Sequence, residues 1–506
     1  MIKLDTRLTK NIVLVLFLAS IMPVFAQINF SPNKKIYVKG NSALIGNNIL
    51  STSSKKAIDD NSVNDFNELK FIDVDDDSNT FSSSQASLKI LEADAEIEYA
   101  ALYWSAIYKY DEGWKEVVSI KKKGKHYKKY VYKGNDKRAL DVNNILFKTP
   151  NNNYEALNGQ IIFDEFDDEE AYPNTKPYVC YADVTSLLKN NTNLNGTYTV
   201  ANMKATQGFV SGGASGGWLL YIVYKSETAT PKYFTSYNGF VDVFKKPVDI
   251  RFNDFKSPEE GSIETSILIG ALEGDQKFKS DKCSFFNYQN NTYIPLFNKI
   301  RPKFNFFNST ISIGDSIFSD RNPNSKNTFG FDALKIKLPN ENNHVISHNV
   351  SEATIQFNSK ADMFYLFFVA FETEISPIYI SVKEDKNSIL VLNNNKDESL
   401  NEDVLVEEVI DEDLEKIKNL KPILIPSIEK GYYLVTNIFS KKTNAANWTN
   451  YLKDKGYTPL SFVNPENNWT YIYLKTDPDP NIIYQKQKDL LKLNDFKDIW
   501  VLRINI

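Results

Sequence analysis

The chain has 506 residues, with 59 lysines and arginines against 64 aspartates and glutamates, and a net charge of −5. This slightly acidic balance argues against nucleic acid as the partner, and the length exceeds what one hydrophobic core usually serves. Phenylalanine and tyrosine are abundant, with 33 and 28 residues, which favours a β-rich protein with aromatic pairs between strands.

Residues 1–26 predict a secretory signal peptide. Basic residues precede an apolar run over residues 12–21, and a small-residue cleavage site ends at Ala26. The residue directly after this site is Gln27 and not a cysteine, so we expect no bacterial lipid anchor. No later segment approaches the ~20 apolar residues of a spanning helix, so no transmembrane segment is expected in the mature chain. The sequence therefore predicts an exported protein that is periplasmic, associated with the outer membrane, or on the cell surface.

Residues 27–376 predict a large antiparallel β-sandwich or jelly-roll region, with a division into two subdomains near residue 245 as an option. Its apolar runs are rich in β-branched and aromatic residues, and Asn, Asp, Gly and Ser bound them. The clearest runs are residues 95–106, 196–203, 217–226, 261–275, 352–358 and 362–375. No comparably long amphipathic helix lies between these runs, which favours a mainly β architecture.

An aspartate-rich segment lies early in this region. Asp73, Asp75 and Asp77 occupy alternate positions, as at the start of a calcium-binding loop. The sixth position is Ser78 instead of glycine and the twelfth is Ser84 instead of an acidic residue, so the EF-hand pattern is incomplete. A structural calcium ion and a solvated acidic turn both remain open, and calcium is the only cofactor that the sequence suggests.

Residues 121–130, KKKGKHYKKY, are strongly basic with interleaved tyrosines. Gly124 lies between two short runs, which favours an exposed hairpin tip. A second interpretation is a surface that docks onto an acidic partner.

Cys180 and Cys283 are the only cysteines. In an exported protein they can form a disulfide, and the alternative is two buried, unreactive thiols. Neither lies in a C-x-x-C motif or beside a histidine, so we expect neither a zinc site nor thiol catalysis.

The stretch 213–217, GASGG, matches G-x-S-x-G, the pattern of a hydrolase nucleophile elbow centred on Ser215. An elbow requires a helix after the serine, whereas Trp218 begins an apolar run that is typical of a strand. Histidines are scarce as well, with three in the chain. A serine hydrolase that uses Ser215 is therefore a remote alternative, and we expect no catalytic residue and no enzymatic activity.

Residues 377–428 predict a linker that contains prolines and is strongly acidic. Ten acidic residues occur between residues 397 and 415 without a basic one, and Pro422 and Pro426 follow. Mutual repulsion favours an extended or partly helical segment here.

Residues 429–506 predict a small α+β domain. Strand patterns occupy residues 431–439, 459–465, 469–476 and 499–506, and helix patterns occupy residues 442–456 and 482–493. On the first helix, Ala446, Trp448 and Leu452 are expected to face the core, and Gly456 to end the helix. The order βαββαβ predicts the ferredoxin-like arrangement on a four-stranded sheet.

The stretches GYYLVTNIFSKKTNAANWTNYLKDKGY, WTYIYL and DIWVLRI follow one another in this domain. With them, residues 429–506 resemble the SPOR (sporulation-related repeat) domain of the Bacteroidota type. The resemblance implies a periplasmic module that binds peptidoglycan glycan strands on the concave face of its sheet, with Trp469, Tyr471 and Tyr433 as the aromatic contacts.

The sequence departs from the glycan-binding members of that family at three positions. Val435 and Ile438 stand where such members carry Gln and Ser, and Tyr471 stands where they carry Arg. The polar groups that would orient a glycan are therefore absent, and a SPOR-shaped domain used for protein contact is the second interpretation.

Within residues 95–275, the stretches YAALYWSA, YADVTSLLKNN, GTYTVANM, GGASGGWLLYIVYKSE and YNGFVDV occur in this order. They resemble the β module of large exported Bacteroidota proteins, including surface adhesins. A module of this kind, joined by an acidic linker to a SPOR-like end and without a recognisable type IX sorting domain, is similar to accessory proteins encoded with gliding-motility adhesins.

These resemblances imply a non-enzymatic exported accessory protein of gliding motility or of surface-adhesin export. The β region would bind a surface adhesin or an outer-membrane barrel protein, and the SPOR-like domain would tether it to peptidoglycan or another periplasmic component. The second hypothesis is a carbohydrate-binding, lectin-like surface protein.

Overall fold

A computed structural model describes residues 28–376, except 123–124, 136–137, 167–171 and 192, and residues 412–505, except 419, 421, 426–427, 466–468, 492–495 and 497–498. The chain divides into two compact units between Lys396 and Asp397. The predicted signal peptide and residues 377–411 of the predicted linker lie outside the described residues. Among the described residues, no helix is long and apolar enough to cross a membrane.

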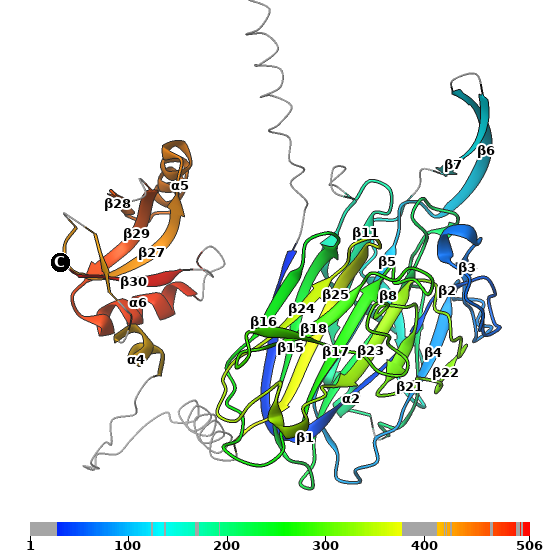
Figure 1. Ribbon diagram of the computed structural model, residues 1–506, viewed down its shortest axis with the longest axis horizontal. Helices are drawn as coiled ribbons and strands as arrows, with labels where there is room; N and C mark the ends of the chain where they lie inside the picture. The colour runs from blue at the N-terminus through cyan, green and yellow to red at the C-terminus, as the bar shows by residue number, and fades with distance from the viewer. Residues whose placement is uncertain are drawn as a thin grey trace, which may run out of the picture. The chain divides into compact units, whose positions relative to one another are not determined.

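The N-terminal unit is mainly β and rich in sandwich packing, as the sequence predicts (Figure 1). Its largest sheet has 11 strands. In sheet order they are β10 (Gln160–Asp164), β11 (Pro177–Asp183), β5 (Glu96–Ile107), β14 (Gly216–Lys225), β1 (Ile28–Asn48), β15 (Pro231–Val243), β25 (Phe364–Glu374), β17 (Thr265–Leu272), β23 (Phe331–Lys337), β20 (Ile311–Ile313) and β21 (Ser316–Ile317).

Smaller sheets complete this unit. A five-stranded sheet contains β22 (Arg321–Asn322), β4 (Ser83–Leu88), β12 (Gly196–Ala201), β8 (Asn144–Lys148) and β9 (Glu155–Asn158). A four-stranded sheet contains β16 (Val248–Phe252), β24 (Ala353–Asn358), β18 (Lys282–Asn287) and β19 (Thr292–Pro295). The others are β13 (Gln207–Gly208) with β6 (Glu112–Lys122) and β7 (Lys125–Gly134), and the pair β2 (Leu50–Ser51) and β3 (Lys70–Phe71); the helix α2 spans Thr185–Lys189.

Strand β1 belongs to both halves of the large sheet. Its residues 40–48 pair antiparallel with β14, and its residues 28–39 pair antiparallel with β15. The pairing with β15 is irregular, with register shifts on either side of Ser31 and Pro32. β1 therefore connects the strands from β10 to β14 with those from β15 to β21.

These two halves pack face to face. Leu219 of β14 lies against Gly270 of β17, where an added Cβ would come within 2.6 Å of the leucine side chain. The rings of Tyr103 on β5 and Phe368 on β25 have centroids 4.7 Å apart. The glycine is required here because any larger side chain would push the two layers apart.

Each half also carries a smaller sheet on its other face. Trp218, next to Leu219, points the opposite way, and its Nε1 donates to Ser84 Oγ of β4 at 2.9 Å. On the other half, Phe371 of β25 stacks on Phe252 of β16 with centroids 4.5 Å apart. The result is four β layers, or two sandwiches back to back. Strands β5, β14 and β25 are continuous apolar runs because both of their faces are buried.

The optional division near residue 245 falls within one compact unit. β22 follows that point in the sequence and pairs with β4 of the first sandwich. Both sandwiches also share β1, so residues on either side of 245 contribute to one body.

The two cysteines lie in different hydrophobic cores. Cys180 belongs to the core that contains β5 and β14, and Cys283 to the core between β17, β24 and β25. Both thiols are free and buried, so the possible disulfide is not formed and the alternative of two buried thiols applies. Burial raises the pKa of both thiols, which keeps them uncharged and unreactive.

The C-terminal unit has a five-stranded sheet. In sheet order its strands are β26 (Ile423–Leu424), β30 (Trp500–Asn505), β27 (Gly431–Phe439), β29 (Trp469–Asp477) and β28 (Leu460–Asn464), and its helices are α4 (Glu412–Lys418), α5 (Lys442–Asp454) and α6 (Pro480–Leu491). The chain order β27-α5-β28-β29-α6-β30 confirms the predicted α+β arrangement. The predicted strand number of four is wrong, because β26 adds a fifth strand at the edge of the sheet.

The apolar side of α5 differs by one residue from the prediction. Ala445 and Leu452 are buried and Trp448 is half-buried, whereas Ala446 is exposed, so its predicted place on the core side is wrong. The buried positions follow spacings of three and four residues, as one face of a helix requires. Gly456 has a φ of +85°, the left-handed conformation that ends the helix, as predicted.

Part of the predicted linker is folded. α4 lies within it, and β26 pairs parallel with β30 at the edge of the C-terminal sheet. The side chains of Ile417 and Ile425 are buried in that unit. The C-terminal unit therefore begins earlier than residue 429.

Candidate functional sites

Ser215 lies buried immediately before β14. Its Oγ donates to Glu273 Oε1 at 2.7 Å, and Glu273 Oε2 accepts from Asn64 Nδ2 at 3.1 Å. Burial raises the pKa of Glu273 well above its usual range, which favours the neutral form of this carboxyl. The strand β14 follows directly, as predicted, in place of the helix that a nucleophile elbow needs. The arrangement is a buried polar anchor and does not present Ser215 to a substrate.

The three histidines form hydrogen bonds with groups other than Ser215. Their partners are Ser119 for His126, the carbonyl of Glu341 for His344, and Asn343 with the carbonyl of Gly261 for His348. No histidine contacts Ser215 through these bonds, so the serine has no general base of the kind that a catalytic triad uses.

The aspartates proposed for calcium accept hydrogen bonds from the protein. Asp73 accepts from Ser83 Oγ at 2.8 Å, and Asp75 accepts from Thr80 Oγ1 at 3.1 Å. Asp77 accepts from the backbone and side-chain nitrogens of Asn79. Within the described ranges, no three His, Cys, Asp or Glu side chains are grouped to hold a metal ion. Calcium at these aspartates stays a prediction.

The aromatic residues proposed for glycan contact differ in exposure. Tyr433 and Tyr471 are only 3% and 7% exposed, whereas Trp469 is 46% exposed. Tyr471 stacks on Phe462 with centroids 4.9 Å apart, and Tyr433 packs edge to face on Tyr473. Of the three proposed side chains, Trp469 is thus the one that a glycan strand could reach without a rearrangement.

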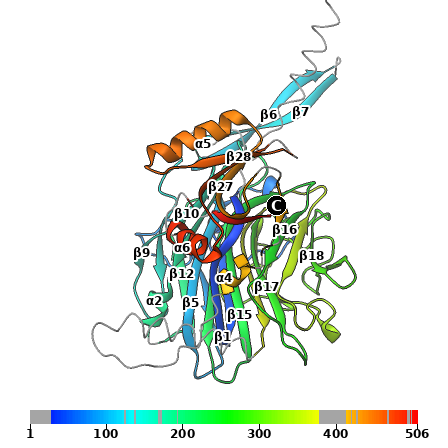
Figure 2. The ribbon, with the colours of Figure 1, turned by 90° about the vertical axis from the view of Figure 1, so that its left-hand side faces the viewer.

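Strands β6 and β7 form a ribbon that projects beyond the sheets of the N-terminal unit in both views (Figures 1 and 2). We call residues 112–134 the arm. Its strands pair antiparallel from Gly113 opposite Gly134 to Lys122 opposite Lys125, which confirms the predicted hairpin. The basic residues 121–130 surround its tip.

The base of the arm is fixed by one aromatic ring. Tyr110 packs on the paired glycines, and a Cβ added to Gly113 or Gly134 would come within 2.2 Å of its ring. The Tyr110 hydroxyl donates to the carbonyl of Phe209 at 3.0 Å. Lys115 lies over the Phe209 ring, 3.9 Å from its centroid. These contacts hold the ribbon at a defined position without covering the rest of it.

The rest of the arm exposes apolar side chains on both faces. Trp114 and Ile120 are 43% and 41% exposed on one face, and Val117 and Tyr130 are 55% and 56% exposed on the other. Residues 112–134 also contain eight lysines and two glutamates. Exposed aromatic rings are enriched where proteins bind partners. The excess of positive charge beside them attracts an acidic surface.

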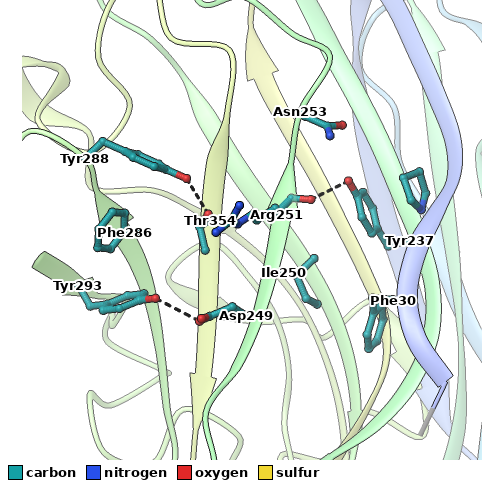
Figure 3. Close-up of a pocket in the computed structure, with 11 residues that line it drawn as sticks. Phe30, Tyr237, Asp249, Ile250, Arg251, Asn253, Phe286, Tyr288, Tyr293 and Thr354 are labelled. Carbon is teal, nitrogen blue, oxygen red and sulfur yellow. Dashed lines mark hydrogen bonds between the residues drawn. The ribbon is translucent and has the colours of Figure 1, made fainter. Parts of the chain in front are cut away.

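A pocket of about 480 Å³ lies on the four-stranded sheet (Figure 3). It is on the face turned away from the hydrophobic core that contains Cys283. The residues that line it come from strands and loops far apart in the sequence. They are Phe30, Pro32, Tyr237, Asp249, Ile250, Arg251, Asn253, Phe286, Tyr288, Tyr293 and Thr354.

Three aromatic rings form one side of this pocket. The centroid of the Phe286 ring lies 4.8 Å from that of Tyr288 and 5.0 Å from that of Tyr293. The hydroxyl of Tyr288 forms a 2.8 Å hydrogen bond with Thr354 Oγ1, and Tyr293 donates to Asp249 Oδ1 at 3.2 Å (Figure 3). Tyr288 and Tyr293 are 42% and 39% exposed, so their rings are oriented by the sheet and still accessible.

Polar side chains of β16 and the residue after it form the other side. Asp249, Arg251 and Asn253 alternate with buried residues and are exposed. Asp249 also accepts from Gln356 Nε2 at 2.9 Å. The side chains of Arg251 and Asn253 form no hydrogen bond or ion pair with any described residue. Burial and the neighbouring Asp249 raise the pKa of Tyr293, which keeps its hydroxyl a neutral donor.

The sequence contains no motif for this pocket. Its lining is assembled by long-range strand pairing, of which β16 with β24 and β18 with β24 are the decisive pairs. The available signal was the alternation in residues 248–253, VDIRFN, which places charged and polar residues on the face away from the core.

Comparisons with known proteins identify no family. No protein-family model matches the chain, and no curated protein matches it. Among solved structures, a recombinant peptide:N-glycanase F matches at 11% identity and a TM-score of 0.16, over 65% of this chain and 96% of its own. The major capsid protein P2 of bacteriophage PM2 matches at 9% identity and a TM-score of 0.15, over 66% of this chain and 98% of its own. TM-scores this low support no inference about this chain.

Proposed function

We propose that the chain is a non-enzymatic exported accessory protein of gliding motility or of surface-adhesin export, and that its β region binds a protein partner through the arm. The functional class rests on the resemblances of residues 95–275 and 429–506. The observation that supports binding through the arm is its exposed, basic and aromatic ribbon, fixed at the base by Tyr110.

The positive charge of the arm indicates which kind of partner it binds. The arm has eight lysines against two glutamates, whereas the whole chain has a net charge of −5. The ion pair between Lys133 and Glu116, at 2.8 Å, neutralises one of these lysines near the base. The tip keeps its positive charge, which attracts an acidic surface and speeds the encounter with it. An adhesin or an outer-membrane barrel protein with such a surface is the expected partner.

Charge reversal on the arm tests this proposal. A variant with Lys121→Glu, Lys122→Glu, Lys128→Glu and Lys129→Glu is expected to lose its partner, because opposite charges become like charges. Co-purification from native membranes after mild crosslinking should fall at least about ten-fold, the equivalent of ~1.4 kcal/mol. Binding of the unchanged protein should also weaken as salt is added.

The control reverses the same number of exposed lysines elsewhere in the N-terminal unit: Lys56, Lys279, Lys299 and Lys360. This variant should keep its partner. Equal loss in the two variants would mean that overall charge and not the arm controls binding. Full retention of the partner by the arm variant would contradict the proposal.

The C-terminal unit has the proposed role of tethering the protein to the cell wall. The full-length protein is expected to sediment with purified peptidoglycan sacculi, and Trp469→Ala to reduce the bound fraction about ten-fold, because an exposed ring can stack on a sugar. The arm variant described above should sediment unchanged. If the wild-type protein stays in solution, the tether is not peptidoglycan, and contact with a periplasmic protein becomes the remaining role of this unit.

A further inference from the structure

We infer that the pocket on β16, β24, β18 and β19 binds an uncharged saccharide. This inference goes beyond the proposed function and does not depend on it, because the arm contributes no residue to the pocket. The volume of about 480 Å³ lies within the range of roughly 300–1,000 Å³ in which proteins bind small molecules.

The aromatic side of the pocket suits the ring of a sugar. A pyranose has C–H groups on its faces, and these carry a slight positive charge that the negative face of an aromatic ring attracts. Tyr288 and Tyr293 are accessible, and their hydroxyls are held by Thr354 and Asp249. Because these bonds restrict the rings before a ligand arrives, little side-chain entropy is lost on binding.

The opposite side suits the hydroxyls at the edge of a sugar. Each hydroxyl can donate one hydrogen bond and accept others, so it needs both kinds of partner. Asp249 supplies carboxylate acceptors, and Arg251 and Asn253 supply N–H donors that no described residue uses. Bonds from hydroxyls to the carboxylate and guanidinium are charge-assisted, and they are the stronger class.

The charge balance excludes other ligand classes. Asp249 and Arg251 are the only charged residues that line the pocket, and their charges cancel. An anion would meet the carboxylate, and a cation would meet the guanidinium. A purely apolar ligand would remove water from both groups without replacing their hydrogen bonds, which is unfavourable. A neutral, hydroxyl-rich ring satisfies both sides at once.

Native gels that contain neutral polysaccharides test the inference with the full-length protein. The probes are dextran, mannan, galactan, xylan and a β-glucan, with hyaluronan as the anionic comparison. At least one neutral polysaccharide is expected to retard the wild-type protein. Tyr288→Ala, Tyr293→Ala and Arg251→Gln should each weaken this retardation about ten-fold, measured as the dependence of mobility on polysaccharide concentration.

Matched controls separate the pocket from general effects. Tyr130→Ala removes a tyrosine of the arm that is even more exposed than Tyr288 and Tyr293, and it should leave the retardation unchanged. Arg251→Gln changes an exposed side chain that has no described partner, so it tests the pocket even if a tyrosine variant unfolds. The charge-reversed arm should also bind polysaccharide as the wild type does, so that loss of the protein partner and loss of the saccharide are distinguishable.

Three results would overturn the inference. One is a folded wild-type protein that none of the neutral polysaccharides retards. Another is stronger retardation by hyaluronan than by every neutral polysaccharide, which would indicate an anion site. The third is retardation that the two tyrosine variants and Arg251→Gln all leave unchanged, since the saccharide would then bind elsewhere.

Discussion

Replacing Asp332 by asparagine is expected to lower the free energy of unfolding of the N-terminal unit by about 3–5 kcal/mol, because it leaves the charge of Arg301 buried without a counter-charge. Both side chains are fully buried and form an ion pair. The carboxylate also accepts from the backbone nitrogens of Asn308, Ser309 and Thr310 at 3.0–3.2 Å. The pair therefore holds the loop before β20 against β23.

Thermal unfolding measures this effect. A loss of this size should lower the melting temperature by about 4–7 °C in a unit of this length. Arg301→Met should cost a similar amount, because the guanidinium donates to Ser312 Oγ at 3.0 Å and to the carbonyl of Phe306 at 3.0 Å. The double variant should be less damaging than the sum of the two changes, since both remove one interaction.

The pair of Lys337 and Glu264 is the matched control. It also joins a lysine or arginine to a carboxylate, but its side chains are 61% and 51% exposed. Lys337→Met should therefore change the stability by less than about 1 kcal/mol. If Asp332→Asn melts within about 2 °C of the wild type, burial of the charge pair does not stabilise the loop as argued.

Lowering the pH from 8 to 5 is expected to stabilise the N-terminal unit, through three aspartates whose pKa values are raised. Burial, followed by repulsion from neighbouring carboxylates, raises the pKa of Asp362 to about 8 and that of Asp275 to about 7. Burial also raises the pKa of Asp281 to about 6. Between the unfolded pKa near 3.8 and these values, the folded state binds more protons than the unfolded state. The free energy of unfolding therefore falls as the pH rises through this window.

Asp362→Asn should remove part of this dependence, because asparagine has a similar shape and no charge. The variant is expected to be more stable than the wild type by about 1–3 kcal/mol at pH 8, a value reduced for the partial exposure of the group, and close to the wild type at pH 4. Melting temperatures measured from pH 4 to pH 8 give both slopes.

Asp94 supplies a control of opposite sign. The backbone nitrogen of Glu227 and the hydroxyl of Ser226 donate to its carboxylate and lower its pKa. Its contribution is present above the unfolded pKa and is lost as the pH falls through the folded value, so Asp94→Asn should be destabilising at pH 7 and not at low pH. Parallel slopes for the wild type and Asp362→Asn would show that this aspartate does not titrate as proposed.

Local structure could be predicted from the sequence where the spacing of apolar residues agrees with a signal for the end of a helix or strand. Trp448 and Leu452 on α5, and Gly456 after it, were located because a helix of this length has one apolar face and a distinct stop. Ala446 was predicted on the core side, whereas Ala445 is the buried residue. Two adjacent alanines give the same local signal, and only packing on the sheet distinguishes them.

The arrangement of the β layers could not be derived in the same way. The run from Trp218 to Tyr224 shows that β14 is buried on both faces, but not which sheets cover it. The pocket could not be predicted from the sequence for the same reason, since Phe30, Arg251 and Tyr288 become neighbours only through pairing between distant strands. Ser215 was the opposite case, because a local pattern suggested a chemistry that its burial beside Glu273 does not support.

Strand β1 also governs the order in which the N-terminal unit can assemble. Gly40 pairs with Lys225 and Ile36 with Phe234, so the first strand to be synthesised has no partner until most of the first sandwich exists. Pairing over such sequence distances is slow, and an unpaired strand of 21 residues is a template for aggregation in the meantime. Residues 28–39 of β1 contain Pro32 and three lysines, residues that discourage strands from pairing with other chains. The composition of β1 thus reduces aggregation of the newly made chain before β14 and β15 are available for pairing.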